Sequence, residues 1–375
     1  MKNYIVPIFI PHMGCPYDCI YCNQKTIAAQ QDVPSPAQTI DIIASYLHTM
    51  PPADSVEVAF FGGSFTALDL AVQRQYLEAV QPFISGGRVT GIRVSTRPDY
   101  IDDQRLELLA AHQVKTVELG VQSLSRRVLK ASSRHYTPED VVRSSNLIKS
   151  LRMDLGIQLM IGLPGDSYQQ DMETTRQVVQ LRPQVVRIYP TLVIAGTALA
   201  QIWQQGKYMP LGLAEAVMTC RDMYIQFQHE DIKVIRMGLY PGEELRRAGN
   251  ILAGPFHPSF GELVEQEIFK EQAQQAITRF RRQAGMLTHL DLYVDHRDVS
   301  KLSGPKRWII NRLCGELGLE NLKIRTLPDL GRDWIGVSRS RTRRVELILT
   351  RKAFLSGFVP RLIAGGILGE EQGAS

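Results

Sequence analysis

The segment SVEVAFFGGSFT, residues 55–66, contains the two features that decide the fold. Residues 55–61 form a short run rich in apolar and β-branched side chains, which is typical of a buried strand. Gly62 and Gly63 follow at once, and two glycines in a strand-to-helix turn let the backbone approach a ligand closely. Glycines in this place also suit a bare turn, so the segment alone leaves both interpretations open.

Similar strand runs recur on both sides of this segment. The pattern predicts strands at residues 3–10, 55–61, 90–95, 115–120, 155–161 and 185–190, with stretches of helical periodicity between them. Three helix starts carry capping residues: Ser35 before Pro36, Thr137 before Pro138 with Asp140, and Ser167 with Gln170. Six strand–helix units predict an α/β fold, a (β/α)6 partial TIM barrel with its active site at the carboxyl ends of the strands.

Beyond residue 190 the pattern changes. It predicts helices at 196–206, 211–229 and 262–284 around a short strand at 232–235, and then a strand at 287–294, a helix at 303–318 and a strand at 321–326. The apolar segment 353–368 is interrupted by Gly357 and Pro360. We therefore expect a core domain over residues 1–260 and a small C-terminal α+β extension with a basic tail over residues 261–375.

The composition, with 44% hydrophobic and 22% charged residues in 375, is that of a soluble protein with a substantial core. We expect a cytoplasmic protein without a membrane partner, because no stretch approaches the roughly 20 apolar residues of a span and residues 1–11 lack a secretory pattern. The net charge of +5 is compatible with a nucleic-acid partner but does not establish one. Cys220 and Cys314 stand alone in apolar, helix-like stretches and are expected to be buried small hydrophobic residues.

The other three cysteines, Cys15, Cys19 and Cys22, lie within eight positions in a C-x3-C-x2-C spacing after the first predicted strand. Such clustering favours a metal or cluster site over a disulfide framework. A cubane iron–sulfur cluster has four irons, so three thiolates can hold three of them and leave the fourth open to another ligand. The alternative is a structural zinc ion completed by His12 or another histidine, although no second Cys or His pair stands at matching spacing.

The cysteine spacing resembles the signature of the radical S-adenosylmethionine (SAM) superfamily, in which an aromatic residue, here Tyr21, stands just before the last cysteine. The resemblance implies a [4Fe-4S] cluster on Cys15, Cys19 and Cys22, SAM on the open iron, and Tyr21 against the adenine. It further implies that the reduced cluster cleaves SAM to methionine and a 5'-deoxyadenosyl radical, which abstracts hydrogen from the substrate. The electron donor would be a flavodoxin or a ferredoxin, and the protein would supply a dry, closed site.

Gly62, Gly63 and Ser64 match the superfamily's Gly-Gly-Glu element, whose backbone groups bind the amino group of the methionine moiety. Ser64 replaces the usual glutamate, which leaves main-chain contacts as the expected binders. His135 lies in a polar segment ahead of a capped helix, where it either contacts the substrate or is an ordinary loop residue.

Glu118 and Gln122 lie an even number of residues apart, so both face the barrel interior if the fourth strand extends through Gln122. A charged glutamate in a barrel lining needs a bonded partner, which favours a ligand or an arginine such as Arg97. Ile161 and Gly162 offer an apolar, small-residue wall suited to an adenine face. We therefore predict Glu118, Gln122 and Ile161 as cofactor neighbours, with a purely structural role for the Glu118 and Gln122 pair as the alternative.

Longer segments extend the resemblance over about residues 5–260. The radical domain of the Elongator catalytic subunit and its bacterial relatives is similar to PHMGCP (11–16), FGGSFT (61–66), STRPD (95–99), VELGVQS (117–123) and RIYPTLVIAGT (187–197). Oxygen-independent coproporphyrinogen oxidases share LGVQ (119–122) and GLPG (162–165). The chain shows no convincing acyl-CoA loop of the first family and no counterpart of the substrate-covering region of the second. The substrate is therefore left open.

The C-terminal residues supply the substrate hypothesis. Lys306, Arg307 and Trp308 open a predicted helix, and Arg339, Arg341, Arg343 and Arg344 form a basic run. Cations at a helix N-terminus can hold phosphate and an aromatic ring can stack on a base, whereas a core tryptophan and solvated arginines are the alternative. RNA, including tRNA, is the leading hypothesis. Two classes stay open beside it: an enzyme acting on a tetrapyrrole or another small molecule, and a cluster-carrying RNA-binding protein without turnover.

Overall fold

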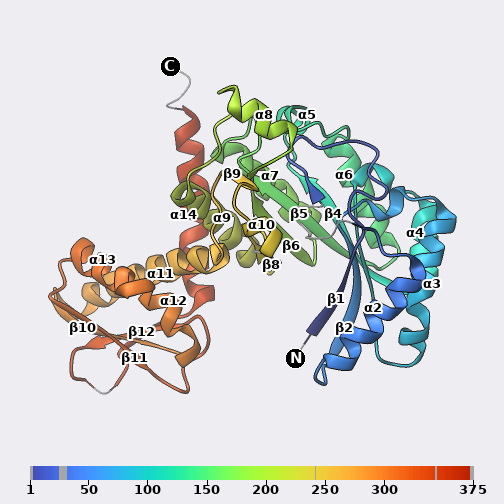
Figure 1. The fold of residues 1–375 in the computed structure, drawn as a ribbon. Helices are drawn as coiled ribbons and strands as arrows, with labels where there is room; N and C mark the ends of the chain where they lie inside the picture. Colours follow the sequence, from blue (N-terminus) through green and yellow to red (C-terminus); the bar gives the residue numbers. More distant parts are fainter. Residues whose placement is uncertain (1–2, 25–31, 241, 343, 372–375) are drawn as a thin grey trace. The chain divides into compact units, whose positions relative to one another are not determined.

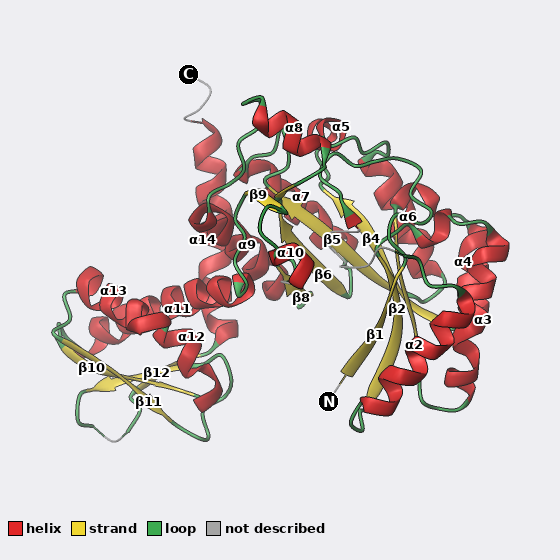
Figure 2. Cartoon of the chain, viewed as in Figure 1, coloured by secondary structure: helices red, strands yellow, loops and turns green. Residues whose placement is uncertain are grey.

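The computed structural model describes residues 3–24, 32–240, 242–342 and 344–371. The chain divides into two compact units, which are described separately: Met1–Ala216 with Ile232–Pro258, and Val217–Asp231 with Ser259–Ser375. Figures 1 and 2 show the elements of both units.

The first unit is built on a seven-stranded parallel sheet, curved into a partial barrel (Figure 1). Its strands, in spatial order, are β1 (Asn3–Phe9), β2 (Ser55–Phe61), β3 (Gly91–Thr96), β4 (Val114–Gln122), β5 (Asp154–Ile161), β6 (Val185–Pro190) and β8 (Lys233–Met237). The spatial order follows the chain order, so neighbouring strands are joined by crossover connections. The predicted α/β partial barrel and its six strands are confirmed. The sheet also contains a seventh strand that the prediction did not place in it, because β8 pairs in parallel with β6.

Helices cover the outer face of this sheet (Figure 2). They are α2 (Pro36–Thr49), α3 (Leu70–Ser85), α4 (Asp103–Ala111), α5 (Arg126–Ala131), α6 (Pro138–Ser150) and α7 (Tyr168–Leu181), with short 3-10 turns η1 (Phe65–Ala67) and η2 (Pro98–Tyr100). The predicted caps are confirmed: Ser35 and Thr137 form capping boxes with Gln38 and Asp140, and the Ser167 side chain accepts from the Gln170 N–H. These caps satisfy N–H groups that would otherwise lack partners.

Strand alternation separates a polar interior from an apolar outer face. In β4, Val117, Leu119 and Val121 are fully buried, and they point to the opposite face of the sheet from Glu118 and Gly120. The same alternation gives β5 its buried Ile157 and Leu159. The apolar core of this unit therefore lies between the sheet and its helices, which leaves the interior free for polar side chains.

The chain after β6 completes the first unit with short elements. These are α8 (Ala198–Gln204), α10 (Glu243–Arg246) and an antiparallel pair of β7 (Val193–Ile194) with β9 (Ile251–Ala253). A small apolar cluster of Leu192, Ile194 and Leu245 stabilises this region. Helix α9 (Leu213–His229) begins here, but its residues from Val217 onward belong to the second unit.

The second unit contains a four-stranded sheet in the order β11 (Asn321–Thr326), β10 (His289–Val294), β12 (Ile335–Arg339) and β13 (Leu347–Leu349). Only β10 and β11 run parallel. Its helices besides α9 are α11 (Phe260–Ala284), α12 (Val299–Ser303), α13 (Trp308–Leu317) and α14 (Arg351–Glu371), and its 3-10 turns are η3 (His296–Asp298) and η4 (Pro305–Arg307). Helix α11 packs against α12, α13, β12 and β13.

Three features of the second unit were not apparent from the sequence. Strands β12 and β13 were not predicted, because both are short, and β12 gains hydrogen bonds from the distant strand β10. The apolar segment interrupted by Gly357 and Pro360 lies within the single helix α14. Of the two solitary cysteines, Cys220 is buried as predicted, whereas Cys314 is only half-buried.

Candidate functional site

Cys15, Cys19 and Cys22 lie in the loop after β1, at the carboxyl edge of the parallel sheet. All three are free thiols and half-buried. The loop is compact, because the Cys15 N–H donates to the His12 carbonyl at 3.1 Å and the Cys22 N–H donates to the Cys19 carbonyl at 3.0 Å. This edge is where α/β folds gather their reactive groups, so the cysteines lie where chemistry is expected.

Burial sets the protonation state of these thiols. Loss of solvation raises the pKa of the Cys15 thiol, and it raises the pKa of the Cys22 thiol to about 12. Repulsion from the Cys19 thiol adds to both pKa shifts. Both shifts favour the protonated thiol at Cys15 and Cys22 in the absence of a bound cation. Because metal ions bind the thiolate form, ligation would release protons.

His12 is the residue that a structural zinc site would add to the cysteines. Its Nε2 atom accepts a hydrogen bond from the backbone N–H of Gln24 at 3.0 Å. In the part of the chain that the structure describes, no set of three or more His, Cys, Asp or Glu side chains converges on one ion position. The His12 ring thus holds the end of the cysteine loop.

Gly63 and Gly14 allow two loops to touch. A Cβ atom at Gly63 would lie 2.2 Å from the carbonyl oxygen of Met13, and one at Gly14 would lie 2.3 Å from the carbonyl oxygen of Ser64. The loop after β2 therefore packs directly on the cysteine loop, and Gly63 is required by the protein's own backbone. Whether Gly62 and Gly63 also contact a ligand stays a prediction.

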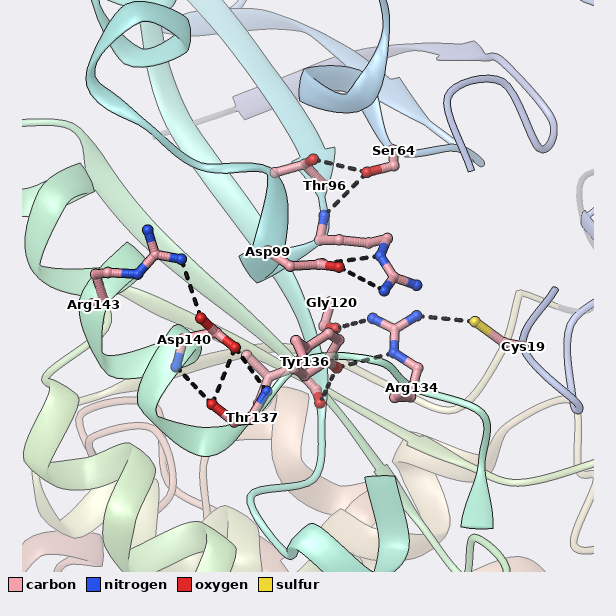
Figure 3. Close-up of polar contacts among 12 residues, drawn as sticks. Cys19, Ser64, Thr96, Asp99, Gly120, Arg134, Tyr136, Thr137, Asp140 and Arg143 are labelled. Carbon is pink, nitrogen blue, oxygen red and sulfur yellow. Dashed lines mark hydrogen bonds and ion pairs between the residues drawn. The ribbon is translucent and has the colours of Figure 1, made fainter. Parts of the chain in front are cut away.

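Ser64 is tied into a group of hydroxyls at the ends of β2 and β3 (Figure 3). Its Oγ lies 3.0 Å from the Thr96 hydroxyl and accepts from the Arg97 N–H at 3.3 Å. Its own N–H donates to the Met13 carbonyl at 3.0 Å. The serine at the glutamate position of the family pattern thus links the second and third strands to the cysteine loop.

The arginine partners of Glu118 differ from the predicted one. Arg97 pairs with Asp99, with Nη2 to Oδ2 at 2.8 Å. Glu118 instead accepts from Arg93 Nη1 and from Arg187 Nε, each at 2.7 Å. Arg97 stands just past the end of β3, whereas Arg93 and Arg187 lie within β3 and β6. Strand register, which the sequence does not reveal, decides the pairing.

Arg93 extends this pairing to a fourth residue, because its Nη2 donates to Glu57 at 2.7 Å. We call Glu57, Arg93, Glu118 and Arg187, which come from β2, β3, β4 and β6, the interior charge row. Burial opposes the charge of Arg187, but the Glu118 carboxylate stabilises its cation and leaves its pKa above the usual value. The row balances two cations against two anions inside the barrel.

Gln122 ends β4 in a left-handed conformation, with φ of 62° and a register shift against β5. Its Oε1 accepts from Gln158 Nε2 at 3.4 Å. Its Nε2 lies only 2.9 Å from where a Cβ of Gly120 would stand. Strand β4 does extend through Gln122 as the prediction required, and the amide reaches the interior side next to Gly120 and Gln158.

Arg134 was missed as a functional candidate, although its segment was singled out for His135. The Arg134 side chain is 8% exposed, and its Nη1 donates to Cys19 Sγ at 3.0 Å (Figure 3). Its Nη2 donates to the Gly120 carbonyl at 2.5 Å and its Nε donates to the Tyr136 hydroxyl at 3.0 Å. Only the fold brings residue 134 to residue 19, so spacing along the chain gave no signal.

Two family models match the sequence around these residues: the Radical SAM superfamily over residues 9–178, and the Radical_SAM C-terminal domain over residues 183–270. The chain belongs to the radical SAM superfamily. It is an enzyme of that superfamily, and the family implies a [4Fe-4S] cluster and SAM as cofactors.

Two curated relatives illustrate what the chain is similar to. The tRNA uridine(34) acetyltransferase of Methanocaldococcus jannaschii is 26% identical over 253 residues, which is 57% of this chain and 47% of that protein. Elongator complex protein 3 of Homo sapiens is 28% identical over 187 residues, 44% of this chain and 34% of that protein. The predicted similarity to the Elongator subunit is confirmed. The chain spans about half or less of the length of these relatives.

A solved structure shows the same fold. The Methanocaldococcus infernus Elp3 with its N-terminus (1–46) deleted aligns with a TM-score of 0.58 at 22% identity, over 72% of this chain and 63% of that chain. Among the described residues, no helix reaches the length and hydropathy that a membrane span requires.

Two buried polar atoms beside the cysteines fit a radical SAM site. The hydroxyl of Tyr21 and the Nη1 atom of Arg97 are buried, and neither has a hydrogen-bond partner in the described part of the protein. Such atoms cost free energy unless a ligand or water satisfies them. The site therefore fits a bound cofactor that brings polar groups of its own.

The Ile161 side chain is fully buried. Its carbonyl accepts from the Thr191 N–H at 3.0 Å and from the Thr191 hydroxyl at 2.8 Å. Its side chain therefore belongs to the core behind the sheet, and a role as a cofactor neighbour stays a prediction.

An exposed aromatic pair and a basic hollow lie next to this site. Tyr17, in the cysteine loop, packs against His135 with ring centroids 4.3 Å apart and the ring planes tilted by 46°. A hollow of about 370 Å³ is lined by Arg126, Leu129, Lys130, Ser133, Arg134, His135, Tyr136 and Thr137. Its lining contains three permanent cations, of which Arg126 is paired with Glu139, so the lining keeps a positive charge that favours an anionic ligand.

The cations predicted to bind RNA lie on the second unit. Lys306 and Arg307 are exposed and left-handed, with φ of 51° and 59°, at the start of α13. Trp308 is half-buried, and its Nε1 donates to Gln266 at 3.4 Å. Arg339, Arg341 and Arg344 are exposed, Arg339 being paired with Glu346, while Arg343 lies outside the described residues. Trp308 is thus partly packed in the core, as the structural alternative expects. The exposed cations remain accessible to a ligand.

Proposed function

We propose that this radical SAM enzyme holds a [4Fe-4S] cluster with Cys15, Cys19 and Cys22. The observation that carries the proposal is that the three thiols share one compact loop at the carboxyl edge of the barrel. When bound, the cluster and SAM supply reductive cleavage of SAM, giving methionine and a 5'-deoxyadenosyl radical that abstracts hydrogen from the substrate.

The residues around the loop would bind and orient SAM. We assign Tyr21 to the adenine, because its ring belongs to the cysteine loop and its buried hydroxyl has no hydrogen-bond partner among the described residues. We assign Gly62, Gly63 and Ser64 to the methionine amino group through main-chain groups, since the Ser64 hydroxyl is already bonded to Thr96. These groups supply position rather than chemistry.

Glu118, Gln122 and Ile161 complete the proposed surroundings of the cofactor. Gln122 offers the amide that lies beside Gly120 on the interior side. Glu118 acts through Arg93 and Arg187, which occupy both of its carboxylate oxygens. Ile161 supports the loop that follows β5, and a flavodoxin or ferredoxin would deliver the electron.

We infer that the substrate is an RNA, including tRNA. The names of the relatives favour it, as do the exposed cations Lys306, Arg307, Arg341 and Arg344 and the basic hollow lined by residues 126–137. Cations arranged over a surface bind the phosphate backbone of nucleic acids through counterion release.

SAM cleavage is the first test. Anaerobically reconstituted protein, reduced with dithionite, is expected to form 5'-deoxyadenosine and methionine from SAM, measured by chromatography. Cys19→Ala removes one ligand and is expected to reduce product to background. Cys314→Ala, which changes a half-buried cysteine on α13, is the matched control and should keep the parent rate.

Product formation by Cys19→Ala at the parent rate would contradict the assignment of Cys19 as a cluster ligand. A parent protein that takes up iron and sulfide, binds RNA and yet forms no 5'-deoxyadenosine would instead support the non-catalytic RNA-binding alternative.

RNA binding is the second test. Affinity for tRNA is expected to fall steeply as salt rises, and each lost phosphate contact should lower the slope of log K against log salt by about 1. The double variant Lys306→Gln, Arg307→Gln should therefore bind more weakly and with a shallower slope than a control, Lys352→Gln, at another exposed cation of the same unit. A flat salt dependence of the parent, or binding of a tetrapyrrole in place of RNA, would contradict the RNA proposal.

A further inference from the structure

We propose that Arg134 is a positioning residue that donates a hydrogen bond to the Cys19 thiolate of the bound cluster and raises the reduction potential of that cluster. The inference rests on the proposed function, because it requires a cluster on the three cysteines.

The geometry shows a donor that is already in place. Arg134 Nη1 lies 3.0 Å from Cys19 Sγ, within the distance of a charge-assisted N–H···S hydrogen bond (Figure 3). The two residues are 115 positions apart in sequence, and the contact joins the loop after β1 to the turn between α5 and α6.

Three protein contacts fix the guanidinium in this orientation. Its Nη2 donates to the Gly120 carbonyl at 2.5 Å, and its Nε donates to the Tyr136 hydroxyl at 3.0 Å. The Tyr136 hydroxyl in turn donates toward the carbonyls of Gly120 at 2.8 Å and Val121 at 2.6 Å, and the cation lies 4.7 Å from the Tyr136 ring centroid. The end of β4 therefore aims the remaining N–H groups at Cys19.

The charge of Arg134 lacks a counter-ion. Within the described residues, no carboxylate lies within ion-pair distance of its guanidinium, although the side chain is only 8% exposed. The neighbouring Arg97 is different, because Asp99 neutralises it. A buried, unpaired cation is costly, and the atom that the structure places against it is Cys19 Sγ, which becomes an anion when it ligates a cluster.

The sign of the effect follows from charge. One-electron reduction adds a negative charge to the cluster, and a fixed cation with an N–H···S bond stabilises the reduced form more than the oxidised form. Arg134 therefore makes the cluster easier to reduce. It acts on the cluster through a ligand and touches no reacting atom of the substrate.

The test compares reduction potentials of reconstituted full-length proteins. Parent, Arg134→Gln, Arg134→Lys, Tyr136→Phe and Arg143→Gln are titrated anaerobically with dithionite in the presence of mediators, and the reduced cluster is followed by electron paramagnetic resonance. Arg143, an arginine of α6 that is paired with Asp140 and 53% exposed, is the matched control. Iron and sulfide content and thermal unfolding are measured in parallel.

Arg134→Gln is expected to lower the equilibrium constant for one-electron reduction at least tenfold, which corresponds to about 59 mV toward more negative potential. Tyr136→Phe, which frees the guanidinium from one anchor, should give a smaller shift in the same direction. Arg143→Gln should match the parent within twofold. Arg134→Lys should fall between the parent and Arg134→Gln, because it keeps a charge but not the planar fork.

If Arg134→Gln protein that contains the cluster has the same reduction potential as the parent, the inference is overturned. If that variant does not fold or load, unchanged potentials in both Arg134→Lys and Tyr136→Phe overturn it equally. A parent protein that binds no cluster contradicts the proposed function itself, whereas a loaded parent with insensitive variants contradicts only the role of Arg134.

Discussion

Asp166 and Asp171 form a pair of carboxyl groups at the N-terminus of α7, just past the carboxyl end of β5. Burial raises the pKa of Asp171 well above its usual value, and the Asp166 carboxylate raises it further. Burial also raises the pKa of Asp166. These shifts favour the neutral form of Asp171 in the folded protein, where its proton can serve a hydrogen bond with Asp166.

This pair predicts a pH-dependent cost. The folded pKa of Asp171 lies above its unfolded value of about 4, so the unfolded state ionises first as the pH rises and the folded state loses relative stability above about pH 4. Asp171→Asn removes that cost and keeps a donor to Asp166. We expect the variant to be stabilised by about 1 kcal/mol or more at pH 7, with the gain shrinking toward pH 4, because each unit of pKa shift corresponds to about 1.4 kcal/mol.

Thermal unfolding between pH 4 and pH 8 checks this expectation. The control is Asp103→Asn, an exposed first-turn aspartate of α4, which separates the buried effect from the ordinary helix-end charge effect. Equal pH profiles for Asp171→Asn and the parent would refute the assignment of a neutral Asp171.

At the scale of elements, the interior charge row joins four strands of the sheet. Glu118 lies at its centre, 4% exposed in its side chain, and accepts from arginines on β3 and β6. Strands β4 and β5 lie between the arginine-bearing strands β3 and β6. The contacts of Glu118 with the two arginines therefore reach across the curved interior of the sheet. Strands whose interior side chains are paired in this way are held in one register.

Removal of Glu118 is therefore expected to be strongly destabilising. Glu118→Gln leaves Arg93 and Arg187 with the single carboxylate of Glu57, and unpaired buried charges cost roughly 3–5 kcal/mol. Glu173→Gln, which breaks the exposed pair with Arg176 on α7, should cost at most about 1 kcal/mol. Thermal unfolding measures both, and a midpoint for Glu118→Gln as high as that for Glu173→Gln would show that the row does not stabilise the sheet.

Elements were predictable where local signals were strong. The six strands from β1 to β6 agree with the predicted ranges within about two residues at either end, because apolar runs, turn glycines and helix caps all act locally. β8 was predicted as a strand, but its place beside β6 depends on the free edge of a sheet formed elsewhere. β12 was missed for the same reason, since it pairs with β10, and β13 was missed because it has only 3 residues.

At the scale of the whole molecule, the second unit is discontinuous in sequence. It combines Val217–Asp231 with Ser259–Ser375, whereas the sequence suggested a single boundary at residue 260. The α9 segment brings Cys220, Met223 and Phe227 to this unit, all fully buried. The domain boundary at residue 260 stays a prediction. The division of the chain into two units suggests an experiment that tests it.

A fragment of residues 259–375 is expected to lack a cooperative thermal transition, because three fully buried side chains of its unit are missing. Joining residues 213–231 to this fragment through a Gly/Ser linker as long as the replaced segment should restore cooperative unfolding, measured by circular dichroism. Cooperative unfolding of residues 259–375 alone, at the midpoint of the fusion, would contradict the expectation.

The sequence by itself determined the cysteine spacing, the parallel α/β rhythm and the membership of the radical SAM superfamily. These features depend on residues close together in the chain, so local pattern is enough. The tertiary structure alone decided that Arg93 and Arg187 pair with Glu118, that Arg134 meets Cys19, and that α9 joins the second unit. Each of these contacts links distant segments, and their meeting is fixed by strand register and packing, which no local pattern specifies.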